Sequence, residues 1–149
     1  MRALVQISGK SSVVVEGKTI GKIDSGIVVL VGFTEGDNQE KIEYIAKKIV
    51  NLRIFDDENS VMNKSILDYG GSILSISQFT LYADTKKGNR PSYINAMGGE
   101  EAIKLYEAFN KELEKYLHVE TGKFGAEMTV NITNDGPITI MLEKWLYVG

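Results

Sequence analysis

Two short segments hold the residues whose types and spacing suit chemistry on a polar ligand. Residues 75–80, Ser-Ile-Ser-Gln-Phe-Thr, gather hydroxyls and one amide at the end of an apolar run. Such strand ends often carry function, although hydroxyls that cap a turn give the same composition. Residues 134–137, Asn-Asp-Gly-Pro, lie between two strand-like runs. Asp-Gly favours a hairpin turn, whereas the following proline fixes φ and removes a backbone donor, so a hairpin turn and a rigid ligand-facing loop both remain open.

The side chains that common hydrolases use are scarce in this sequence. His118 is the single histidine, and its position after a helical stretch favours interaction with a helix C-terminus over general-base catalysis. The lack of cysteine removes thiol nucleophiles and zinc–thiolate sites. The acidic run Asp56-Asp57-Glu58 is better explained as solvated loop charge than as a Mg²⁺ site, and the glycine patterns of phosphate-binding loops are missing. The sequence therefore predicts no metal and no cofactor.

Length and composition are those of an ordinary soluble domain. The 149 residues suit one domain, residues 1–149, with 43% hydrophobic and 25% charged residues. The formal net charge of −3 gives no global basic field, although local Lys and Arg clusters can still hold phosphates. No apolar run is long enough for a membrane span, and no secretory signal pattern begins the chain. We therefore expect a cytoplasmic protein.

Hydrophobic periodicity predicts the elements that position the two segments. Strands are expected within residues 2–31 and at 72–77, 127–132 and 138–142. Helices are expected over 37–52 and 99–117, the first with Asp37 as N-cap and Glu40 completing a capping box, and residues 84–97 form an exposed loop. Short connections favour antiparallel pairing. The predicted fold is a single α/β (α+β) domain with a curved, largely antiparallel, barrel-like sheet and two main helices.

Together, in this order, the two segments resemble the signatures of a known enzyme family. Ser-Gln-Phe-Thr-Leu at 77–81 and Asn-Asp-Gly-Pro-Ile-Thr at 134–139 resemble the two motifs of the D-aminoacyl-tRNA deacylases. The start of the chain resembles the family too, as do Arg-Ile-Phe at 53–55, Arg-Pro-Ser-Tyr at 90–93 and Thr-Gly-Lys-Phe-Gly-Ala-Glu-Met at 121–128. The resemblance covers essentially the whole chain in family order, which is far more specific than one short motif.

The resemblance implies an activity and an assembly. The reaction is hydrolysis of the ester that links a D-amino acid, or glycine mischarged on tRNA-Ala, to the terminal ribose of tRNA, with L-aminoacyl-tRNA rejected. The partners are tRNA and a second copy of the chain, in a homodimer with active sites at the interface, and neither DNA nor a membrane is a partner.

The resemblance also assigns roles by position. The pocket around the adenosine end and the scissile ester is lined by Ser77, Gln78, Phe79 and Thr80. Gly136 and Pro137 form a Gly-cis-Pro element that enters the partner subunit's site and selects the handedness of the substrate. The remaining substrate-binding positions are Asn134, Phe124, Gly125, Ala126 and Met128. No metal position is implied.

The chemistry implied by the resemblance fits the absence of a strong nucleophile. An aminoacyl ester is already activated, so positioning and backbone N–H groups that stabilise an oxyanion can supply much of the rate. The N–H groups of Phe79 and Thr80 are the expected oxyanion donors, and water, helped by the ribose 2′-hydroxyl, is the expected attacking group. Thr80 as a covalent nucleophile stays an alternative, although no base lies near it in sequence.

Three further features of the sequence bear on this interpretation. Family members typically carry an arginine where this chain has Ile7, which bears on how the Gly-Pro loop is braced and on stringency against L-substrates. The best local basic cluster for tRNA is Lys86, Lys87 and Arg90, although solvated surface charge explains each of them equally well. At the C-terminus, Trp145, Leu146 and Tyr147 are expected to pack on the core or to cover part of a dimer interface.

Three rival readings give different experimental results. A non-catalytic RNA- or nucleotide-binding module would bind tRNA without deacylating it. A general small-molecule esterase would hydrolyse simple activated esters as well as charged tRNA. A structural dimer, in which both motifs are only strand turns, would do neither.

Overall fold

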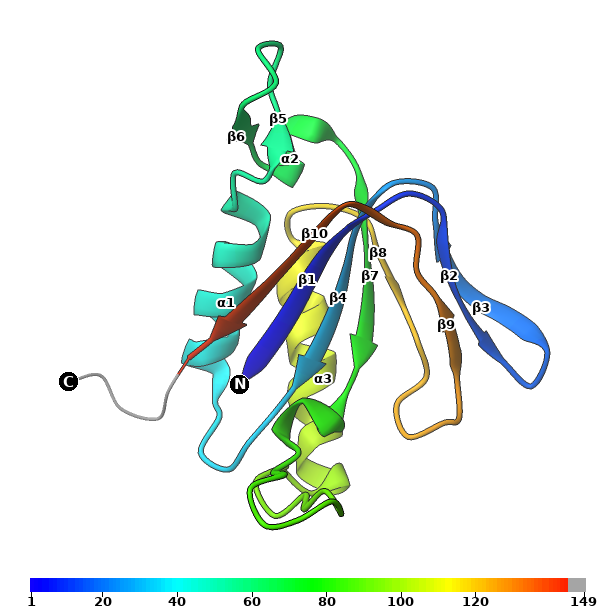
Figure 1. Cartoon of the computed structure of the whole chain (residues 1–149), viewed down its shortest axis with the longest axis vertical. Helices are drawn as coiled ribbons and strands as arrows, with labels where there is room; N and C mark the ends of the chain where they lie inside the picture. The colour runs from blue at the N-terminus through cyan, green and yellow to red at the C-terminus, as the bar shows by residue number, and fades with distance from the viewer. Residues whose placement is uncertain (145–149) are drawn as a thin grey trace.

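A five-stranded sheet organises the protein, whose computed structural model describes residues 1–144 (Figure 1). The strands are β1 (Arg2–Ser8), β4 (Gly26–Gly32), β7 (Ser72–Ser77), β8 (Val119–Thr121) and β10 (Asn134–Glu143). Their order across the sheet is β10-β1-β4-β7-β8. The strands predicted for the first 31 residues and for 72–77 are confirmed. The positions predicted for Trp145, Leu146 and Tyr147 lie outside the described residues.

The sheet is mixed because its connections are of two kinds. β1 pairs antiparallel with β4 and with β10. β7 pairs parallel with β4 and with β8, and each of these connections includes a long helix. These helices are α1 (Gln39–Asn51) and α3 (Gly99–Glu114). A helical crossover returns the chain to the same end of the sheet, which allows parallel pairing. The expectation of a largely antiparallel sheet therefore missed the two parallel pairings.

A second sheet packs against one side of the first. It consists of β3 (Lys18–Ile23), β2 (Ser11–Val15) and β9 (Thr129–Asn131), in that order. Val13 and Ile23 of this sheet pack against Val28, Leu74 and Ile76 of the main sheet in a small buried cluster. Within the described residues the strands do not close into a barrel, because β10 and β8 remain the edges of the main sheet. The barrel-like prediction was therefore wrong.

A small appendage follows α1 at one end of the molecule. It comprises β5 (Phe55–Asp56), β6 (Met62–Lys64) and α2 (Ile66–Tyr69). Ser65 caps α2 in a capping box with Asp68, and the rings of Phe55 and Tyr69 stack at 4.3 Å. α2 was not predicted from the sequence.

The two faces of the main sheet are covered unequally. Both α1 and α3 pack on one face, where Phe109, Leu113, Ile42 and Ile45 are buried in the main hydrophobic core. On the opposite face the second sheet covers Val28 of β4, whereas in Figure 1 no described helix or strand crosses that face of β10 and β1. We call this the open face. It carries the partly exposed side chains Leu4, Leu30, Gln6, Thr139 and Met141.

Two details of the helices differ from the prediction. Asn38, not Asp37, caps α1, and its side chain accepts a hydrogen bond from the Lys41 amide at 3.1 Å. The Asp37 carboxylate is buried instead, where it accepts from the Met1 amino group at 2.9 Å and from Lys41 Nζ at 3.3 Å. α3 ends at Glu114, earlier than predicted, and Tyr116 is exposed. No helix in residues 1–144 is long and apolar enough to cross a membrane.

Candidate active site

The first motif forms a tight turn at the end of β7. Its residues continue into η1, a 3₁₀ helix at Phe79–Tyr82, and the Gln78 amide donates to the Val31 carbonyl at 2.7 Å. This close approach depends on Gly32. A Cβ at Gly32 would lie 2.7 Å from the Gln78 carbonyl oxygen, so any other residue would displace the turn.

A cavity of about 520 Å³ opens beside this turn. Of the residues predicted for the site, it is lined by Ser77, Gln78, Phe79, Phe124, Gly125, Ala126 and Met128. The structure thus brings together the end of β7 and the segment after β8, although they are far apart in sequence. Most of the lining is apolar, which suits a base or an aromatic ring, and a few polar atoms at its edge suit orientation of a ligand.

Phe79 lines the cavity, and the backbone N–H groups of Phe79 and Thr80 begin the helix η1. The first amides of a helix have no acceptor inside it, and within residues 1–144 no oxygen accepts from the N–H of Phe79 or Thr80. Thr80 does not line the cavity, and its hydroxyl accepts a hydrogen bond from the Gln78 side-chain amide. This arrangement fits a role for Thr80 through its backbone better than a role as nucleophile.

Arg2 fastens the other end of η1. Its guanidinium donates to the Leu81 carbonyl at 2.7 Å, pairs with Glu143 and lies 4.5 Å from the centre of the Tyr82 ring. Burial raises the pKa of the Tyr82 phenol well above its ordinary value, so this ring stays neutral at physiological pH. η1 is therefore held at both ends, by β4 at its start and by Arg2 at its end.

Ser75 turns out to be structural. It is fully buried, and its hydroxyl donates to Asn110 Oδ1 of α3 at 2.6 Å, while the Tyr106 hydroxyl donates to its carbonyl at 2.7 Å. Burial also raises the pKa of the Tyr106 phenol. Because the Tyr106 ring lies 6.0 Å from that of Phe124, this network supports one wall of the cavity.

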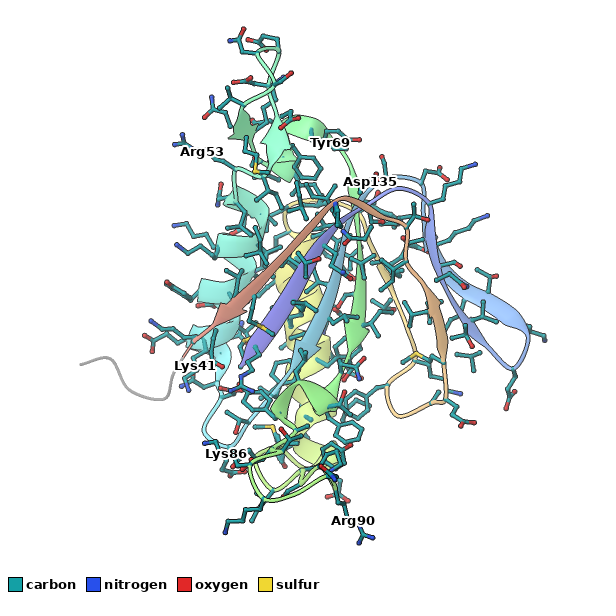
Figure 2. The ribbon with its side chains drawn as sticks, in the orientation of Figure 1. Lys41, Arg53, Tyr69, Lys86, Arg90 and Asp135 are labelled. Atoms are coloured by element: carbon teal, nitrogen blue, oxygen red, sulfur yellow. The ribbon has the colours of Figure 1, made fainter. Side chains whose placement is uncertain are left out.

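The second motif lies at the opposite end of the sheet. In β1, Arg2 pairs with the cavity residue Gly32, whereas Ser8, six residues further on, pairs with Asn134. At roughly 3.3 Å per residue this separation is about 20 Å. Figure 2 labels Asp135 at one end of the sheet and Lys86 and Arg90 at the other, beside the loop around η1. One chain therefore does not bring its own second motif to its own cavity.

The second motif is not a hairpin turn. Its residues belong to β10, while β9 pairs in the other sheet, so the chain changes sheets between them. The Gly136-Pro137 peptide bond is cis, and Gly136 has a φ of +112°. Gly136 and Pro137 are both exposed at the sheet edge.

The remaining predicted positions lie on the surface. Lys86, Lys87 and Arg90 are exposed in a loop that an isolated bridge between Asp84 and Ser92 closes. The exposed His118 ring lies 2.7 Å from Glu120 and does not cap α3. The described residues contain no group of three or more His, Asp or Glu side chains that could hold a metal ion.

Comparison with known proteins identifies the family. The model of the D-Tyr-tRNA(Tyr) deacylase family matches residues 4–143. This chain belongs to that family. D-aminoacyl-tRNA deacylases of Clostridium novyi and Halalkalibacterium halodurans are 55% and 52% identical to it over 145 residues. That alignment covers 97% of this chain in both cases, and 97% and 99% of the respective relatives.

Two solved structures resemble the deacylase fold of this chain. The c-Myc DNA Unwinding Element Binding Protein is 43% identical with a TM-score of 0.92, over 97% of this chain and 99% of its own. A probable eukaryotic D-amino acid tRNA deacylase shares the fold with a TM-score of 0.82 at 16% identity, over 95% of this chain and 97% of its own.

Several cavity residues of this deacylase-family chain were missed from sequence. They are Gly32, Phe33, Ile76, Met97, Gly99, Ala102, Glu127 and Val130. The one available signal was Gly32, a glycine that ends a buried apolar run, where close backbone approach is a common reason for glycine. The others look like ordinary core or loop residues, and only the fold brings them to the cavity.

Proposed function

We propose that this protein carries out the reaction of its family, hydrolysis of the ester bond of D-aminoacyl-tRNA to free D-amino acid and tRNA. Glycine mischarged on tRNA-Ala is the second proposed substrate, and L-aminoacyl-tRNA is rejected. The observation that carries the proposal is the convergence of Gln78, Phe79 and the 124–128 segment around one cavity in a chain of this family.

The cavity suits the terminal adenosine of tRNA. Phe79 is 55% exposed and meets Tyr93 edge to face at 5.0 Å, so an aromatic surface is available beside the opening. Bases stack on such rings with little dependence on sequence. The basic cluster of Lys86, Lys87 and Arg90 lies in the adjoining loop, where it would contact backbone phosphates.

Catalysis then depends on backbone donors. With the ester carbonyl at the mouth of the cavity, the free N–H groups of Phe79 and Thr80 would stabilise the oxyanion that forms when water attacks. The tetrahedral intermediate collapses with loss of the ribose oxygen, which takes up a proton. The ribose 2′-hydroxyl of the substrate would assist the water, so no histidine or cysteine is needed.

Handedness would be selected by Gly136 and Pro137 of a second copy of the chain. Proline fixes its own φ, and Gly136 offers no side chain, so the backbone carbonyls of the pair can approach a ligand closely. Carbonyls can receive the α-amino group and leave no space for an L side chain, which is specificity by exclusion. Within one chain the second motif lies about 20 Å from the cavity, at roughly 3.3 Å per residue, which supports the idea that a partner subunit supplies Gly136 and Pro137.

The open face is the surface that would form the homodimer. Leu4, Leu30 and Met141 give it an apolar centre, and Met141 is 48% exposed. A two-fold axis that lies between two such faces, perpendicular to the strands, reverses the direction of the second sheet. The Gly136-Pro137 end of each copy then meets the cavity end of the other, as expected for an isologous interface.

The test uses purified protein with D-Tyr-tRNA, Gly-tRNA and L-Tyr-tRNA. We expect the D-Tyr and Gly esters to be lost well above the buffer rate and the L-Tyr ester to survive. Survival of the D-Tyr and Gly esters would refute the proposal, and equal turnover of simple activated esters would favour a general esterase. The Thr80→Ala variant should retain measurable activity, whereas complete inactivity of the folded variant would restore the nucleophilic role.

A further inference from the structure

Gly136 and Pro137 lie in a stretch that the β-ladder does not hold. β1 and β10 pair at Ser8 with Asn134 and again at Gln6 with Thr139. Between these two pairs, four residues of β10 face the single residue Ile7. Such a bulge leaves the extra residues unpaired and directs them away from the sheet. Something other than strand pairing must therefore fix the direction of the Gly136 and Pro137 carbonyls.

The Asn134 side chain spans this gap. Its Nδ2 donates to the Ile7 carbonyl of β1 at 2.9 Å and to the Ile138 carbonyl at 2.9 Å. The first bond ties the start of the bulge to the neighbouring strand. The second closes a ring of five residues around Gly136 and Pro137. A single amide group thus fixes both ends of the unpaired stretch.

The other half of the same amide is also engaged. Asn134 Oδ1 accepts from Thr139 Oγ1 at 3.2 Å and from Gln6 Nε2 at 3.4 Å, and Gln6 Nε2 donates to Thr139 Oγ1 at 3.1 Å. Both donors and both acceptor positions of the side chain are therefore used inside the protein. A side chain committed in this way has no hydrogen-bonding capacity left for a substrate, which favours a role through the loop over direct binding of the substrate.

Because Ile7 has no polar side chain, the side-chain amide of Asn134 has to hold the bulge in this chain. The side chain of Ile7 is buried in the main core and carries no polar group, so only the backbone carbonyl of this residue takes part in holding the bulge. The brace must then come from a side chain that reaches this carbonyl, and in the described residues Asn134 is the side chain that donates to it.

We propose that Asn134 is a positioning residue that fixes the direction of the Gly136 and Pro137 carbonyls and so determines how strictly L-aminoacyl-tRNA is rejected. Gln6 and Thr139 hold the Asn134 amide in its orientation. This inference rests on the proposed function, because it concerns the specificity of the same site. It differs from a substrate-binding role, since the side chain acts only through the loop.

The test is the Asn134→Asp variant, which keeps the shape but replaces the donor group with an oxygen that faces two carbonyls. Loss of both bonds should lower the ratio of D-Tyr-tRNA to L-Tyr-tRNA deacylation about tenfold or more, as expected for one or two hydrogen bonds in a partly buried site. The matched control is Asn131→Asp, which alters an exposed amide of β9 whose one bond goes to Ser12 Oγ at 3.2 Å. The control should keep the wild-type ratio.

A second readout separates this inference from the activity itself. The amide signals of Gly136 and Ile138 in ¹H–¹⁵N spectra should shift in Asn134→Asp and stay unchanged in Asn131→Asp. An inactive wild-type enzyme would refute the proposed function and leave this spectral prediction standing. A wild-type ratio together with unshifted signals in Asn134→Asp would overturn the inference.

A third variant tests the inference even if Asn134→Asp does not fold. The double variant Gln6→Ala/Thr139→Val removes the partners of Asn134 Oδ1 at partly exposed positions and leaves its donors in place. Freed from its orienting partners, the amide should rotate, and the deacylation ratio should fall in the same direction. An unchanged ratio in this double variant would equally overturn the inference.

Discussion

Gly32→Ala should slow deacylation without unfolding the protein. The added Cβ would lie 2.7 Å from the Gln78 carbonyl oxygen, with the Leu81 and Tyr82 side chains next at 3.3 and 3.4 Å. Since favourable contact between such atoms begins at about 3.5 Å, the Gln78 backbone has to move by about 0.8 Å. Gln78 leads directly into the Phe79 and Thr80 amides, so the proposed oxyanion donors move with it.

The size of the effect follows from that displacement. A misplacement of about 1 Å in a catalytic group costs about a hundredfold in rate, so we expect kcat to fall roughly 10- to 100-fold. This corresponds to about 1.4–2.8 kcal/mol in the activation free energy. KM for charged tRNA should change much less, because the cavity and the basic loop keep their residues.

The assay is single-turnover deacylation of D-Tyr-tRNA, with thermal unfolding measured on the same samples. Gly98→Ala is the matched control, because a Cβ at Gly98 meets no atom within 4 Å and its φ of −61° suits any residue. A folded Gly32→Ala variant with the wild-type single-turnover rate would refute the role assigned to the β4–η1 contact. An equal loss in Gly98→Ala would refute it as well.

Three other perturbations test separate parts of the account. Met141→Glu should give a monomer in sedimentation and abolish activity, because an unpaired charge buried at the interface costs several kcal/mol. The control Ile20→Glu on β3, which is similarly exposed, should stay dimeric. A dimeric, active Met141→Glu variant would exclude the open face as the dimer interface. Alanine at Lys86, Lys87 and Arg90 together should raise KM for tRNA. The slope of log affinity against log salt concentration should flatten by roughly 0.7–0.9 for each phosphate that the protein no longer binds, and Lys104→Ala is the control. An unchanged slope would count against this loop as the tRNA-binding surface. Ser75→Ala should lower the free energy of unfolding by about 1–3 kcal/mol, because Asn110 loses its buried donor. Chemical denaturation measures this change, and an unchanged midpoint would contradict the prediction.

The sequence predicted the parts of the fold that depend on local periodicity. The β7 bounds and the start of α3 follow from apolar spacing, and the core positions of α1 follow from one helical face. Parallel pairing was missed because it depends on where a crossover helix returns the chain. The N-cap of α1 was misplaced by one residue because Asp37 is occupied by two buried cations, and that contact is invisible in the local sequence.

The sequence predicted only those site residues that belong to the family motifs. The family resemblance alone placed Gln78 and Phe79 with the 124–128 segment, and the structure brings them around one cavity. The role of Gly32 and the buried position of Ser75 depend on contacts between distant elements. The separation of Gly136 from the cavity depends on strand register, and periodicity does not encode which end of a sheet a residue reaches.

Mixed dimers provide the sharpest test of the proposal that each active site combines the cavity of one chain with Gly136 and Pro137 of another. One variant carries Phe79→Asp in the cavity, and the other carries Gly136→Val, whose side chain would collide with Ile138 at a φ of +112°. Each variant alone should be inactive, because Phe79→Asp removes the aromatic surface of the cavity and displaced Gly136 and Pro137 carbonyls no longer receive the α-amino group of the substrate. After the two are mixed under conditions that exchange subunits, half of the dimers are hybrids with one intact site of two, so activity should return to about a quarter of wild type. If mixing restores no activity although hybrids form, the two motifs do not act across the interface and the proposed shared active site is refuted.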